Sequence, residues 1–159
     1  MEDRDLTFKT NEGIFNYRVG AIIIRDKKIL MVKNDNAPYY YSVGGRVKLN
    51  ETSEEAVVRE TFEETGIKFE IDRLAFIHEH FFHEEITKEH YHEIAFFYLM
   101  KENTNVNFVC KSSGDQGEKE HLYWLPIEKL DQYHLFPEFF KTKLSGNMTG
   151  IEHIVSKEC

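Results

Sequence analysis

One sharply delimited helix constrains the fold of this chain more than any other stretch. Thr52 and Glu55 have the spacing of a capping box, in which each side chain bonds the backbone of the other residue, and this predicts the first turn of a helix. Gly66 lies where a helix needs a left-handed residue to end. The residues between them therefore predict one central helix.

Apolar and aromatic runs on both sides of this helix predict β-strands. Asp26 and Lys27 join the first two strands as a hairpin, and Pro126 and Pro137 each predict the first position of a later helix. The pattern indicates one α/β domain over residues 1–159, with no linker that would divide it. The predicted strands span residues 15–26, 28–34, 39–45, 67–82, 90–102, 106–110 and 121–125.

Composition limits the classes of partner. The chain is 41% hydrophobic and 30% charged, which is typical of a globular protein, and its formal charge of −8 argues against broad binding of nucleic acid or anionic membranes. Two cysteines provide no disulfide framework, the first residues do not resemble a secretory signal, and no apolar run is long enough to span a bilayer. We expect a cytoplasmic protein.

Three glutamates gather on one side of the predicted helix. At 100° per residue, Glu60, Glu63 and Glu64 share one face. An acidic face is most often simply solvated, because each pair of like charges costs only about 0.2–0.5 kcal/mol. The opposite side is predicted to be a buried stripe of Val57, Val58, Thr61, Phe62 and Thr65.

Three features favour a metal site over a solvated acidic face. The acids lie in the last turns of the helix, where the macrodipole disfavours anions. Arg59 can orient a neighbouring carboxylate through a bidentate contact. Gly44 and Gly45 precede the helix across a short loop, and glycine lets the backbone approach a ligand and offer a carbonyl. Carboxylates and a carbonyl suit magnesium or manganese.

The spacing of these residues resembles the Nudix box. The segment GRVKLNETSEEAVVRETFEETGI, residues 45–67, fits G-x5-E-x7-R-E-U-x-E-E-x-G-U, where U is an aliphatic residue. Every charged and glycine position fits, and the one departure is Thr61 at the first U position. The resemblance implies a Nudix-type α/β/α sandwich around a mixed β-sheet.

The resemblance also implies an activity, the metal-dependent hydrolysis of a diphosphate linkage in a nucleoside diphosphate joined to another moiety. Mg²⁺ or Mn²⁺ would be the cofactor, and a small-molecule nucleoside diphosphate derivative would be the partner. Glu60 and Glu64 are the implied direct ligands, with Glu63 as a third and Gly45 contributing its carbonyl.

Other residues receive supporting roles from the same resemblance. Arg59 would hold the carboxylates in place, and Glu51 would support them from behind. The general base of such enzymes sometimes lies outside the box, and here Glu118 or Glu120 is the candidate for a base or an additional ligand.

Several residues outside the box have two interpretations. Tyr39, Tyr40 and Tyr41 precede the glycines, and alternation along a strand would turn one or two of them toward the cleft. Arg25, Lys33, Arg46 and Lys48 can help to bind phosphate, although ordinary surface positions are favoured.

Five histidines crowd into residues 78–93. On adjacent strands they can form a cross-strand transition-metal site, but no cysteine joins them, so surface and cleft positions are favoured. These histidines are His78, His80, His83, His90 and His92.

Markers of substrate class are absent. The proline that marks ADP-ribose hydrolases has no counterpart, because no proline lies between Pro38 and Pro126. The region of Phe82 and His83 replaces the tyrosine of dinucleoside polyphosphate hydrolases. We expect a nucleotide or nucleotide-sugar type of diphosphate. A non-catalytic nucleotide sensor and a metal-binding domain without a nucleotide ligand stay open as alternatives.

Overall fold

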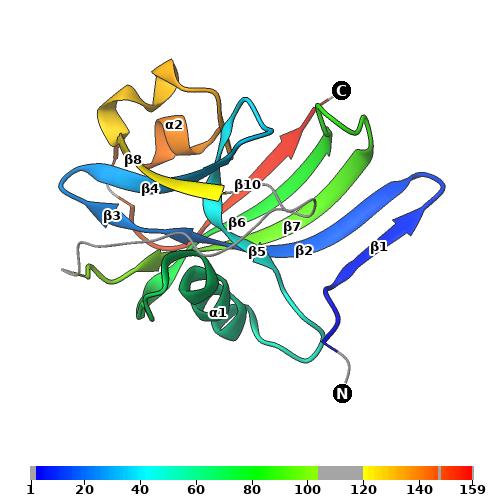
Figure 1. Cartoon of the computed structure of the whole chain (residues 1–159), viewed down its shortest axis with the longest axis horizontal. Coiled ribbons are helices and arrows are strands. Elements are labelled where there is room, and N and C mark those ends of the chain that lie inside the picture. Colours follow the sequence, from blue (N-terminus) through cyan, green and yellow to red (C-terminus); the bar gives the residue numbers. More distant parts are fainter. Residues whose placement is uncertain (1–2, 104–119, 147, 159) are drawn as a thin grey trace.

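A mixed β-sheet organises the computed structural model, which describes residues 3–103, 120–146 and 148–158 (Figure 1). The strands are β1 (Thr7–Thr10), β2 (Gly13–Ile22), β3 (Ile24–Arg25), β4 (Lys28–Asn34), β5 (Tyr40–Arg46), β6 (Ile71–His83), β7 (His90–Met100), β8 (Glu120–Pro126), β9 (Leu135–Phe136) and β10 (Glu152–Lys157). The helices are α1 (Ser53–Thr65), the 3₁₀ helix η1 (Ile127–Gln132) and α2 (Phe140–Lys143).

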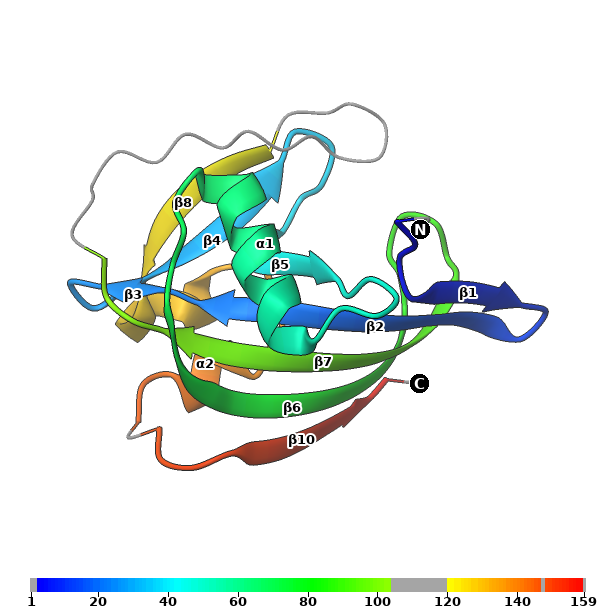
Figure 2. The same cartoon turned by 90° about the horizontal axis from the view of Figure 1, so that it is seen from below.

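The strands run in the order β10-β6-β7-β2-β5-β4-β3, while β1, β8 and β9 pair with β2, β4 and β5. The pairs β2–β7, β6–β10 and β5–β9 are parallel, and the other pairs are antiparallel. Ala21 packs in one core with α1, whereas its neighbour Ile22 packs in a second core with η1 and α2. Because adjacent strand residues face opposite ways, the helices lie on opposite faces of the sheet (Figure 2), and the α/β prediction is confirmed.

The predicted boundaries of the central helix are confirmed. Thr52 Oγ1 accepts a bond from the Glu55 amide at 3.0 Å, and Glu55 Oε1 accepts one from the Thr52 amide at 3.1 Å. Gly66 adopts φ 77° and donates its amide to the Phe62 carbonyl at 2.8 Å. The predicted hairpin also forms, with φ 51° at Asp26 and 62° at Lys27, as a tight turn between twisted strands requires.

The buried side of α1 differs from the predicted stripe. Val57, Thr61 and Thr65 of the predicted stripe are buried, and so are Ala56 and Glu64, which the stripe did not include. The predicted burial of Phe62 is wrong, because 53% of this residue is exposed. The helix is rotated so that its acidic edge, rather than its aromatic residue, meets the sheet.

Some elements differ from their predicted extent. Pro126 ends β8 and is followed by the 3₁₀ helix η1, and the α-helix predicted from Pro137 covers only α2. β9 and β10 were not predicted, because each is held by long-range pairing rather than by a local turn signal. β1 was also missed, although a tight turn at Asn11 and Glu12 joins it to β2. The predicted strand at 106–110 lies outside the described residues. No helix in the described ranges has the length and apolarity needed to cross a membrane.

The five histidines divide between the two faces of the sheet. His78 and His80 stack on one face with ring centroids 4.8 Å apart, while His83 and His90 meet on the other at 4.9 Å. The five histidines therefore do not form a single cluster, because their rings lie on opposite faces of the sheet.

Burial of His78 predicts an acid-sensitive fold. His78 is 3% exposed, its Nε2 lies 2.8 Å from Ser156 Oγ, and burial lowers its pKa to about 3. In the unfolded chain His78 binds a proton near pH 6.5, whereas in the folded chain it stays neutral. Protonation therefore favours the unfolded state, and the free energy of unfolding falls below about pH 6.5 by up to about 1.4 kcal/mol per pH unit.

We therefore expect the unfolding free energy, measured by urea titration, to fall more steeply between pH 7 and pH 5 in the natural chain than in His78→Gln. Glutamine is neutral at both pH values and can still bond Ser156. Equal slopes for the two proteins would contradict this prediction.

Candidate active site

The guanidinium of Arg59, on α1, is bound at every N–H group. Its Nε and Nη2 donate to the two oxygens of Glu51 at 2.7 and 2.9 Å, which is a bidentate ion pair. Nη2 also donates to the Arg46 carbonyl at 3.1 Å. The pair with Glu51 raises the pKa of Arg59 and lowers the pKa of the Glu51 carboxyl. Arg59 is thereby fixed to the loop before α1 and to the end of β5.

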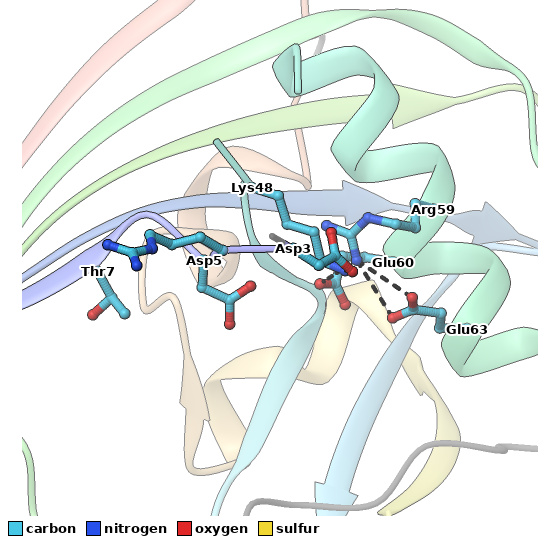
Figure 3. A pocket seen from close by; sticks show the side chains of 8 residues that line it. Asp3, Asp5, Thr7, Lys48, Arg59, Glu60 and Glu63 are labelled. Atoms are coloured by element: carbon cyan, nitrogen blue, oxygen red, sulfur yellow. Dashed lines mark hydrogen bonds and ion pairs between the residues drawn. The ribbon is translucent and has the colours of Figure 1, made fainter. Parts of the chain in front are cut away.

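Two more carboxylates meet the remaining nitrogen. Arg59 Nη1 donates to Glu60 Oε1 at 3.0 Å and to Glu63 Oε1 at 3.4 Å (Figure 3). The side chain of Glu63 is 50% exposed, whereas that of Glu60 is 16% exposed. Arg59 therefore brings together three of the glutamates singled out in the sequence, Glu51, Glu60 and Glu63.

Glu60 lies directly against the backbone of Gly45. A Cβ atom at Gly45 would overlap the Glu60 carboxyl group, so the strand can approach the carboxylate only because residue 45 has no side chain. Burial raises the pKa of Glu60, and Arg59 opposes this shift. Gly45, which the resemblance makes a carbonyl donor, thus lies against Glu60, one of the implied ligands.

Glu64 is the most deeply buried of the helix glutamates and lies against β5. It is 5% exposed and accepts a bond from the Gly44 amide at 3.2 Å. Burial is the main cause that raises the pKa of Glu64 well above its ordinary value, and Glu120 and Glu60 add to it. Glu64 thus has two acidic neighbours, a combination that favours uptake of a cation or a proton.

Glu120, at the start of β8, is held by a tyrosine. The Tyr41 hydroxyl donates a hydrogen bond to Glu120 Oε2, and burial together with this carboxylate raises the pKa of Tyr41. Of the three tyrosines before the glycines, Tyr41 is the one beside the acids, and alternation along the strand was the signal for it. Glu118, the other candidate base, lies outside the described residues.

A pocket of about 640 Å³ opens beside Glu60 and Glu63 (Figure 3). Arg59 and Lys48 also line the pocket, on the side formed by residues 45–67. The facing wall was not anticipated from the sequence, and it consists of Asp3, Arg4, Asp5 and Thr7.

The other three cationic residues considered for phosphate binding are not among the described residues that line this pocket. Arg46 Nη1 lies 3.9 Å from Asp5 Oδ2, at the edge of an ion-pair distance. Lys33 lies over the ring of Tyr40, 5.2 Å from its centroid. Arg25 lies on β3, in the hairpin at the far end of the sheet order.

Parts of the sequence are similar to proteins named as a pyrophosphatase and as MutT-like. Over 52 residues the chain is 50% identical to an ADP-ribose pyrophosphatase of Methanocaldococcus jannaschii, which covers 31% of each chain. Over 66 residues it is 33% identical to a MutT-like protein of Streptomyces ambofaciens, covering 41% of this chain and 43% of that one. The chain thus aligns with less than half of the length of these curated relatives.

The fold has solved counterparts. A MutT NUDIX hydrolase of Burkholderia pseudomallei superimposes with a TM-score of 0.56 at 28% identity, covering 72% of this chain and 84% of that one. The family model described as NUDIX domain matches residues 15–143, which include the Arg59 cluster and most of the sheet. This chain therefore belongs to the Nudix hydrolase family.

Proposed function

We propose that this protein hydrolyses a diphosphate linkage in a nucleoside diphosphate joined to another moiety, and that the reaction depends on Mg²⁺ or Mn²⁺. The observation that carries the proposal is a pair of carboxylates against two adjacent glycines: Glu64 is buried beside the Gly44 amide, and Glu60 is mostly buried against Gly45. Burying two acids together is costly without a cation, and the resulting rise in both pKa values is typical of functional sites.

The donor set suits a hard divalent cation. Glu60 and Glu64 would be direct ligands, Gly45 would offer its carbonyl, and Glu63 would join from the exposed side. In the described part of the chain no three acidic side chains are gathered at metal-binding distance, so a bound cation would have to draw these carboxylates together. All of these donors are oxygen atoms, which magnesium and manganese prefer. When bound, such a cation supplies charge neutralisation for the diphosphate.

The remaining residues position these acids and move a proton. Arg59 holds Glu60 and Glu63 in place, and its pair with Glu51 fixes the guanidinium. Glu120 is proposed as the general base that takes a proton from the attacking water, because it adjoins Glu64. Tyr41 would keep the Glu120 carboxylate oriented through its hydroxyl.

The names of the relatives suggest substrates for a first screen. One of them is named an ADP-ribose pyrophosphatase, so ADP-ribose belongs in a panel with nucleotide sugars and nucleoside triphosphates. Release of phosphate or nucleoside monophosphate in the presence of magnesium tests the function, and no hydrolysis across the panel would favour a nucleotide sensor.

Removal of either buried acid should stop the reaction. Substitution of groups that only support metal ligands typically costs 10–100-fold, so we expect Glu60→Gln and Glu64→Gln each to lower kcat by at least about 100-fold. Circular dichroism should show that the fold persists. Glu54→Gln, in the first turn of the same helix, is the matched control and should keep full activity. Retained turnover in both test variants would refute the proposed site.

Gly45→Ala should damage the site without changing its charge. The new Cβ would overlap the Glu60 carboxyl group, and overpacking of this kind commonly lowers the free energy of unfolding by about 1–3 kcal/mol. We expect a lower melting temperature and a large loss of kcat. Gly146→Ala is the control, because its Cβ would meet no atom within 4 Å. Equal behaviour of the two variants would contradict the proposed contact.

Tyr41→Phe should impair turnover more than binding. It removes the hydrogen bond to the Glu120 carboxylate, and a bond to a charged group contributes about 1.5–3 kcal/mol, so we expect kcat to fall about tenfold or more with little change in KM. Tyr40→Phe, whose ring faces Tyr123 and Tyr133, is the control and should leave kcat unchanged. A rise in KM alone for Tyr41→Phe would oppose a role in orienting the base.

A further inference from the structure

The wall that faces the box acids comes from residues 3–7. The Leu6 amide donates to the Val47 carbonyl at 2.8 Å, and the Leu49 amide donates to the Arg4 carbonyl at 2.8 Å. Asp5 and Lys48 form a β-bridge between these two bonds. The segment is therefore attached to the loop that leads into α1, and it holds a fixed position relative to the acids.

The character of the pocket restricts its occupant. Seven of the eight lining residues are charged and the eighth, Thr7, carries a hydroxyl. Nucleobases are commonly held by stacking on aromatic rings, and no aromatic ring lines this pocket among the residues that the structure describes. A phosphorylated, hydroxyl-rich group matches the lining better than a base does.

An internal anion occupies the cationic side of the pocket. The Asp3 carboxylate lies 2.5 Å from Lys48 Nζ, and both Lys48 and Arg59 lower the pKa of Asp3, the hydrogen bond from Lys48 most of all. The side chain of Asp3 is 76% exposed, so this ion pair is weak and easily exchanged. Its position is one that a phosphate group can take.

Lys48 is better suited than Arg59 to exchange its partner. The five N–H groups of Arg59 already meet Glu51, Glu60, Glu63 and the Arg46 carbonyl. Lys48 instead carries a mobile ammonium group whose paired anion is exposed. A ligand phosphate can replace Asp3 at Lys48 without disturbing the clamp on the acids.

We propose that the phosphorylated, hydroxyl-rich half of the substrate enters this pocket, where Lys48 binds its phosphate in place of Asp3. This assignment rests on the proposed diphosphate hydrolysis and adds a binding residue outside the acidic cluster. Asp3 acts as an internal competitor that neutralises Lys48 in the free protein.

The test measures binding of inorganic pyrophosphate to the full chain by calorimetry in the presence of magnesium. Lys48→Ala should weaken binding about two- to fivefold, the range of an exposed ion pair, whereas Asp3→Asn should tighten it by a similar factor. Lys68→Ala is the matched control, because Lys68 lies outside this pocket beside Phe62, and it should leave binding unchanged.

The opposite signs separate binding from damage to the fold, since general destabilisation would not tighten binding. Unchanged affinity in both Lys48→Ala and Asp3→Asn, or weaker binding in Asp3→Asn, would overturn the inference while hydrolysis by the natural chain still supports the proposed function. Conversely, opposite shifts in pyrophosphate affinity with no hydrolysis of any substrate would refute the function and leave the binding site standing.

Discussion

The Arg59 guanidinium is the interaction on which this site depends. It binds Glu51 before the helix, Glu60 and Glu63 within it, and the Arg46 carbonyl at the end of β5. A rigid fork with five donors can satisfy all of these acceptors at once, which a lysine ammonium could not. Because the contacts come from three successive parts of the chain, the charge that keeps the acids together also fixes the loop between strand and helix.

The acids differ in how they are stabilised. Glu63 is half exposed and its charge is solvated, while Glu60 is mostly buried but paired with Arg59. Glu64 is buried beside Glu60 and Glu120 and accepts a bond from the Gly44 amide. Repulsion among the carboxylates therefore grows toward the sheet. The packing of α1 holds Glu64 there against its electrostatic preference, as the proposed binding of a cation requires.

Local signals in the sequence predicted the parts of the fold that local chemistry determines. The caps of α1 and the turn at Asp26 and Lys27 follow from side-chain and backbone bonds within a few residues. The rotation of α1 did not follow from its pattern. Thr61 and Thr65 bond carbonyls one turn earlier, at 2.6 and 2.7 Å, so these polar residues are buried without cost while Phe62 stays exposed. The helical pattern predicts the burial of both threonines correctly, but it also places Phe62 inside and Glu64 on the outer face, and the structure reverses these two positions.

Apart from the local β1–β2 hairpin, the parts that were not predicted come from long-range pairing. The box places Glu60 and Glu64, but Tyr41 reaches Glu120 across 79 residues of sequence, and residues 3–7 reach the box loop only through the sheet edge. Local spacing can specify the acids of the proposed metal site, since they share one helix and the loop before it. The walls that select a substrate come from segments that only the tertiary fold brings together. In this chain, the proposed chemistry and the proposed selectivity of the site therefore have separate structural origins, which explains why a clear motif leaves the substrate unspecified.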